Sequence, residues 1–157
     1  MARFPRSGCT ARTTLHLVGP QSWTAVPAAL VYDSHDPFAV RVRFGDVDSS
    51  YDDASDGSDD GGVEWLLSRE LLRAGLVGPV GDGDVRLWPA RGGLDVLFLQ
   101  LRAPSGEALF EMSGAAVADF LRETELLVPA GAETDELRVD DELYALLGGG
   151  KDNPSAH

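Results

Sequence analysis

The stretch from Thr24 to Phe44 reads TAVPAALVYDSHDPFAVRVRF, and no other part of the chain predicts its structure so clearly. Apolar residues recur at every second position on either side of its centre, which is the period of a half-buried β-strand. The segment 33–37 between the two halves consists of turn-forming residues. We therefore predict a β-hairpin with strands over 24–32 and 38–44. The apolar face of the second strand should be formed by Phe38, Val40, Val42 and Phe44.

The same pattern extends outward from this hairpin. Further strands are predicted over 9–18, 63–67, 84–89, 94–102 and 107–112. Helices are predicted over 69–74 and 113–126, with a last one from Asp140 or Asp141 to Leu147. The longest helix should bury a stripe formed by Val117, Phe120, Leu121 and Thr124. Strands precede the main helices and are joined as hairpins, so we expect an α+β fold built on an antiparallel sheet or partial barrel.

Length and charge set the domain organisation. The 157 residues suffice for one domain, expected over 9–147, with flexible termini at 1–8 and 148–157. The net charge is −13, and the segment 46–62 alone carries seven Asp and no Lys or Arg. We interpret that segment as an acidic surface loop. Cys9 is the single cysteine, and no apolar run reaches the roughly 20 residues that span a bilayer, so a cytoplasmic protein without membrane insertion is expected.

Residues for catalysis are scarce. The three histidines, His16, His35 and His157, are far apart in the sequence, and no nucleophile motif is present. Asp52 falls on the first position of a calcium-loop pattern, but Val63 stands where that loop needs a bidentate Glu. We therefore predict that the chain is not an enzyme and has no catalytic, cofactor-binding or metal-binding residues.

The balance of charge also bears on nucleic acid. Trp23, Trp65 and Trp88 could stack on bases, but Lys151 is the only lysine and the 12 arginines are spread along the chain. A nucleic-acid-binding protein should present a basic stripe. We expect the tryptophans to pack in the core and no nucleic acid to bind. A single-stranded nucleic-acid-binding regulator stays open as the alternative function.

An ordered set of segments adds a family resemblance. The set comprises Val26–Val40, Trp65 with Ser68-Arg69, Gly81–Pro89, Ser105–Leu109, Phe120-Leu121, and Val128-Pro129 with Glu133. Together these segments resemble the SsgA-like sporulation and cell-division proteins of actinobacteria, over about Leu15 to Leu147. The segment between Phe44 and Val63 is longer than is usual in that family.

The resemblance implies both a fold and a function. It implies a Whirly-like architecture assembled as a homo-oligomer, with a trimer as the expected form. It also implies a non-enzymatic adaptor that governs septum-site placement and is recruited from the cytoplasm to the division septum. The expected partners are division proteins such as FtsZ or another SsgA-like paralogue.

Three residues within the family-like segments are candidates for partner contact: Arg69, Arg86 and Trp88. Arginine is enriched at the centres of interfaces because its planar fork makes several directed hydrogen bonds. Arg69 also stands at the start of a predicted helix, where the helix dipole disfavours positive charge. The alternative is that Arg69 or Arg86 pairs with an internal acid such as Glu70 or Asp84.

Overall fold

A computed structural model of the chain describes residues 7–45 and 63–147. It contains one eight-stranded antiparallel sheet in the order β4-β3-β2-β1-β8-β7-β6-β5. The strands are β1 (Gly8–Val18), β2 (Trp23–Asp33), β3 (Ala39–Phe44), β4 (Glu64–Ser68), β5 (Val80–Asp82), β6 (Val85–Pro89), β7 (Leu97–Ala103) and β8 (Gly106–Met112). The helices are α1 (Arg69–Gly75), α2 (Gly114–Leu127) and α3 (Glu133–Leu147). The predicted α+β class, hairpin connections and partial barrel are confirmed.

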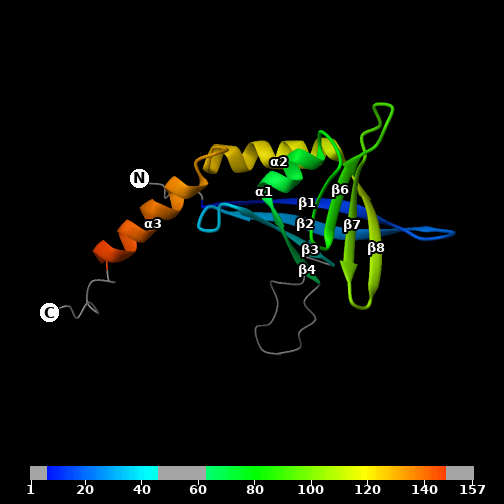
Figure 1. The fold of residues 1–157 in the computed structure, drawn as a ribbon, viewed down its shortest axis with the longest axis horizontal. Helices are drawn as coiled ribbons and strands as arrows, with labels where there is room; N and C mark the ends of the chain where they lie inside the picture. The colour runs from blue at the N-terminus through cyan, green and yellow to red at the C-terminus, as the bar shows by residue number, and fades with distance from the viewer. Residues whose placement is uncertain (1–6, 46–62, 148–157) are drawn as a thin grey trace.

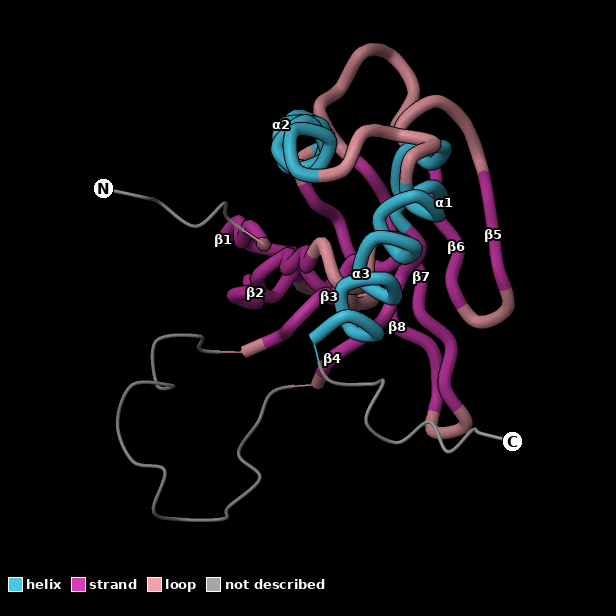
Figure 2. Tube along the Cα trace, turned by 90° about the vertical axis from the view of Figure 1, so that its left-hand side faces the viewer, coloured by secondary structure: helices cyan, strands magenta, loops and turns pink. Residues whose placement is uncertain are grey.

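The sheet consists of two runs of successive hairpins, β1–β4 and β5–β8. They are joined where β1 pairs with β8 over a short register, His16 with Glu111 and Leu17 with Phe110. This short contact lets the sheet curl into a half-barrel (Figure 1). Helices α1 and α2 lie together at one end of it, and α3 extends away from the strands (Figures 1 and 2).

The core lies on the inner face of the curled sheet. Alternate residues of the strands are completely buried there, among them Leu15, Leu30, Val42 and Leu99. Helix α2 covers this face with the predicted stripe, since Val117, Phe120, Leu121 and Thr124 are all buried. Period-two and helical patterns in the sequence therefore identified the core-facing residues of both element types.

Several predictions need correction. Strand β5 was not predicted; three residues are too few to show an alternating pattern. Phe38 is 50% exposed and precedes β3, because the turn after Pro37 carries it out of the sheet. Trp23 is 65% exposed at the start of β2, so it is not a core residue.

The last helix begins at Glu133, well before Asp140. Its first turn carries Glu133, Asp135 and Glu136, and acidic side chains stabilise a helix N-terminus. At the other end of the domain, β1 begins at Gly8, one residue before the predicted strand, and Ser7 O accepts a hydrogen bond from Ser34 N.

Some predictions fall outside the described residues: the flexibility of 1–6 and 148–157, and the acidic loop 46–62. The Whirly-like comparison stays a prediction. Within residues 7–45 and 63–147, no helix is long and apolar enough to cross a membrane.

Candidate protein-interaction site

Arg69 is the first residue of α1, yet its side chain points into the protein. Only 1% of it is exposed, and it is among the largest fully buried side chains of the described residues. Two local contacts fix its backbone: Ser68 Oγ caps α1 by accepting from Leu71 N at 2.8 Å, and Arg69 N donates to Phe38 O at 2.7 Å. The strand-to-helix junction therefore aims the guanidinium at the opposite helices.

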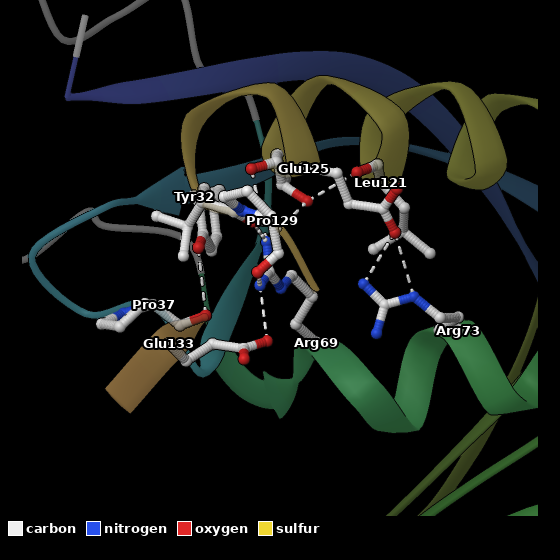
Figure 3. Close-up of polar contacts among 10 residues, drawn as sticks. Tyr32, Pro37, Arg69, Arg73, Leu121, Glu125, Pro129 and Glu133 are labelled. Atoms are coloured by element: carbon white, nitrogen blue, oxygen red, sulfur yellow. Dashed lines mark hydrogen bonds and ion pairs between the residues drawn. The ribbon is translucent and has the colours of Figure 1, made fainter. Parts of the chain in front are cut away.

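The guanidinium joins the end of α2 to the start of α3 (Figure 3). Its Nη1 donates to Val128 O at 2.7 Å and, at longer distances, to the carbonyl and hydroxyl oxygens of Thr124. Its Nη2 donates to Pro129 O at 3.4 Å and to Glu133 Oε1 at 2.5 Å. Because the last carbonyls of a helix carry partial negative charge, the cation is stabilised there.

This arrangement explains the unfavourable position of Arg69 in α1. The charge is misplaced for the helix that carries it but well placed for the C-terminus of α2. The predicted internal partners, Glu70 and Asp84, are not the ones used; Glu133 is, from 64 residues along the chain. Among the described residues Arg69 Nε is the one buried side-chain nitrogen or oxygen without a hydrogen bond.

Two neighbouring groups respond to this cluster. The carboxyl of Glu133 is partly buried, which opposes its ionisation, but the hydrogen bond and charge of Arg69 outweigh this and lower its pKa. The Arg69 guanidinium also lies 5.1 Å from the centre of the Tyr32 ring. Burial raises the pKa of Tyr32 to about 12 against the opposing charge of Arg69, and its hydroxyl donates to Pro37 O at 3.1 Å. Tyr32 is therefore neutral at any physiological pH.

A second ion pair joins α1 to α2, the helix whose end also accepts hydrogen bonds from Arg69. Arg73, in the last turn of α1, donates to Glu125 Oε1 of α2 at 2.9 Å (Figure 3). Both side chains are about one-third exposed, so water weakens this pair. Arg69 is thus the buried and stronger link, and Arg73 the outer one.

Arg86 and Trp88 lie elsewhere, on the outer face of the sheet. They alternate along β6 with Val85 and Leu87, which are buried. Trp88 is half-buried and stacks on Phe98 of β7, with ring centres 5.5 Å apart and an interplanar angle of 22°. Within the described part of the chain, Arg86 is exposed and makes no hydrogen bond or ion pair.

A shallow depression of about 410 Å³ lies beside these two residues. Its walls include Pro79, Gly81, Arg86, Trp88 and Gln100. The site offers a flat aromatic and proline surface next to a guanidinium with unused donors, which suits a protein segment that carries an apolar side chain and a carboxylate. The structure thus brings Arg86 and Trp88 together but places Arg69 in a separate, interior cluster.

Sequence reasoning missed part of each cluster. Phe98 belongs to the outer face by simple alternation along β7, so its pairing with Trp88 could have been found from the strand register. Glu133 lay within a family-like segment, but its pairing with Arg69 depends on how α3 leaves α2. Among the described residues, no three His, Cys, Asp or Glu side chains are placed to hold a metal ion.

Comparisons with known proteins match the part of the chain that contains both clusters. The family model described as Streptomyces sporulation and cell division protein, SsgA, matches residues 26–133. This chain belongs to the SsgA family. Its relatives named sporulation-specific cell division protein SsgB include one from Frankia casuarinae, 41% identical over 143 residues, which are 90% of this chain and 92% of the relative. The SsgB of Streptomyces coelicolor is 39% identical over 142 residues, 88% of this chain and 96% of the relative.

Solved structures agree with the family assignment. A crystal structure of an SsgA-like sporulation-specific cell division protein from Thermobifida fusca superimposes with a TM-score of 0.75 at 34% identity, over 92% of this chain and all of that one. A structure of SsgB from Streptomyces coelicolor gives a TM-score of 0.69 at 36% identity, over 86% and 99% of the two chains. The predicted resemblance is confirmed, and the relatives support a role in cell division and sporulation.

Proposed function

We propose that this protein is a non-enzymatic adaptor that controls where the sporulation septum is placed, through contacts with division proteins. The observation that carries the proposal is its similarity to proteins named SsgB, at about 40% identity over most of the chain. The proposed partners are FtsZ or another SsgA-like paralogue, met at the division septum. The working form is a homo-oligomer, with a trimer as the expected state.

The surface around Arg86 and Trp88 is the proposed contact with the division partner. Arg86 has donors without partners among the described residues, and Trp88 presents half-buried aromatic area fixed by Phe98. Rigid aromatics and arginines carry much of the energy of protein interfaces, because they bury area and direct hydrogen bonds at low entropic cost. Arg69 enters the proposal as a positioning residue, since its buried side chain fixes α1 against α2 and α3.

The test is co-sedimentation of the full-length protein with FtsZ polymers, repeated with Arg86→Ala and Trp88→Ala. We expect the wild type to pellet with the polymers and each variant to pellet at least about tenfold less well, as for a central interface residue. Arg102→Ala is the matched control, because Arg102 is also an outer-face strand arginine but pairs with Glu107. Equal pelleting of Arg86→Ala, Trp88→Ala and wild type would remove this surface from the contact. If the wild type itself fails to bind, FtsZ is not a direct partner, and the same variants are then assayed for septal localisation in a sporulating actinobacterium.

A further inference from the structure

Strand β5 forms one of the two edges of the sheet. It follows β6 as the last strand in the sheet order, and Figure 2 shows it at the rim of the molecule. Helix α1 lies on the inner face instead, where Gly75 packs against Leu87 of β6. An edge strand has backbone N–H and C=O groups that its own sheet does not pair.

The hydrogen bonds of β6 show which residue of β5 has these free groups. Arg102 N donates to Asp84 O at 2.9 Å, so Asp84 directs its backbone towards β7. Successive residues of a strand direct their backbone groups to opposite neighbours. Val85 therefore faces β5, where it pairs with Asp82. By the same alternation the preceding residue of β5, the exposed Gly81, directs its N–H and C=O away from the sheet.

The side chain of Arg86 lies beside these free groups. Arg86 stands directly opposite Gly81, on the outer face of the sheet. A Cβ added to Gly81 would lie 3.3 Å from Arg86 Cγ, so the stem of the arginine lies against the bare backbone of β5. The glycine therefore lets the guanidinium approach the edge of the sheet.

No acid of the described residues forms an ion pair with Arg86. Asp84 lies two residues before it in the sequence, but the two side chains are not bonded. The other nearby acid is Glu107, which accepts from Gln100 and is paired with Arg102 at 2.8 Å. The Arg86 guanidinium therefore has donors available for a carboxylate from another protein.

We propose that an extended segment of the division partner adds to the free edge of β5 as an antiparallel strand and places a carboxylate beside Arg86. This inference rests on the proposed function and names the mode of contact at the same surface. Only Gly81 has free groups, and an antiparallel ladder can use both of them with one partner residue. That residue would lie two strand spacings, about 9.6 Å, from Arg86 across a position without a side chain.

The depression beside the edge adds a second requirement. Along an added strand, side chains two residues apart share a face and lie about 6.8 Å apart. The next such position is level with Pro79 and Trp88, because the register that sets Gly81 opposite Arg86 also sets Pro79 opposite Trp88. Both of these residues line the depression of about 410 Å³. The partner segment should therefore carry an acid and, two residues away, an apolar side chain.

The opposite edge of the sheet, β4, lacks this combination. Phe44 N donates to Val63 O at 2.9 Å, so by alternation Leu66 directs its backbone N–H to solvent. The outer-face arginines of the neighbouring β3 share the carboxylate of Glu64. That edge has a free backbone donor beside arginines that are already bound, and it provides the matched control.

The test compares Gly81→Pro with Leu66→Pro in co-sedimentation with FtsZ polymers. Proline is tolerated at outward positions of edge strands, and each substitution removes one outward N–H. Gly81→Pro should weaken binding about threefold or more, as expected for one lost hydrogen bond, and Leu66→Pro should leave it unchanged. Gly81→Ala keeps the N–H and adds a Cβ beside Arg86, so it should weaken binding less than Gly81→Pro. Circular dichroism checks that all three variants are folded.

Hydrogen exchange provides an independent measurement on the unsubstituted protein. In the complex, the segment 79–83 should gain one slowly exchanging amide, that of Gly81, because its N–H is then bonded. The segment 64–68 at the other edge should exchange as in the free protein. If Gly81→Pro unfolds, this measurement decides alone.

The outcomes distinguish this inference from the proposed function. If Arg86→Ala weakens binding while Gly81→Pro and the exchange of 79–83 show no change, the surface stands and strand addition is overturned. Equal losses for Gly81→Ala and Gly81→Pro, with 79–83 unprotected, trace the effect to crowding at Arg86 and also overturn it. Self-association of the protein alone that Gly81→Pro abolishes would assign the edge to a second copy of the chain instead.

Septal localisation in a sporulating actinobacterium decides if FtsZ does not bind the wild type. Loss of localisation in Gly81→Pro together with normal localisation of Leu66→Pro would support strand addition by another division protein. Any other result for these two folded variants overturns it.

Discussion

Replacing Arg69 by alanine should destabilise the fold more than any surface substitution. The change leaves the carbonyl oxygens of Thr124, Val128 and Pro129 without their donor, and it leaves the Glu133 carboxylate unpaired in a partly buried place. Breaking a buried, hydrogen-bonded ion pair from one side costs about 3–5 kcal/mol. The free energy of unfolding of a small domain is about 5–15 kcal/mol, so the substitution should remove a large share of it.

The expected readout is thermal unfolding followed by circular dichroism. For a chain of this size each kcal/mol shifts the melting temperature by about 2–4 °C, so the loss should be roughly 6–20 °C. Arg69→Lys should fall between wild type and Arg69→Ala, because one ammonium group keeps the charge but cannot bridge α2 and α3 with a planar fork. Arg122→Ala is the control: its partner is Asp119, both side chains are about 70% exposed, and the change should stay within about 0.5 kcal/mol. A melting temperature for Arg69→Ala within about 2 °C of wild type would refute the reasoning.

Three further predictions follow from single contacts. The lowered pKa of Glu133 contributes stability above pH 4.3, about the pKa of an unfolded glutamate, and this stability is lost as pH falls through the lower pKa of the folded state. The stabilities of wild type and Glu133→Gln, measured by unfolding at decreasing pH, should therefore converge at low pH. Burial raises the pKa of Tyr32 to about 12, whereas its pKa in the unfolded chain is about 10, so the free energy of unfolding should fall as pH rises from about 10 towards 12. Tyr32→Phe should remove that pH dependence, and the lost hydrogen bond to Pro37 O should cost about 1 kcal/mol of stability. Gly75→Ala should lower the melting temperature through overpacking worth about 1–3 kcal/mol, because the added Cβ would lie 2.7 Å from Leu87 Cβ; an unchanged melting temperature would mean that α1 can move away from β6.

The sequence predicted most of the fold because hairpins and amphipathic helices are local patterns. The alternation in 38–44 and the stripe of α2 each depend on residues within a few positions of one another. Phe38 was assigned to the strand because it continues the apolar alternation of 40, 42 and 44. It lies in the turn instead, and β3 begins one residue later, at Ala39. Strand β5 was missed because three residues are too few to show alternation, and the strand is defined by its pairing with β6. The local signal for this hairpin is Gly83 in the intervening turn, where φ is 60°.

The contacts between distant segments were beyond sequence patterns. No pattern in the sequence predicts that β1 pairs with β8, which joins the two half-sheets. The stacking of Trp88 on Phe98 and the placement of Arg12 and Arg43 on either side of Ala29 both follow from strand register, which hairpin lengths and the hydrophobic face set together. The acids of α3 were visible in the sequence, but the start of that helix at Glu133 was not predicted.

Arg69 shows how a local anomaly should be interpreted. The helix dipole disfavours a cation at a helix N-terminus, so an arginine there indicates that another interaction compensates for the cost. The sequence suggested an external partner or a nearby acid. The structure shows that the compensation is internal and distant: the negative end of α2 and the carboxylate of Glu133 together stabilise the charge. The same bond fixes where α3 leaves the domain, so a residue buried in the strand-to-helix junction determines the position of a helix far from it in the sequence.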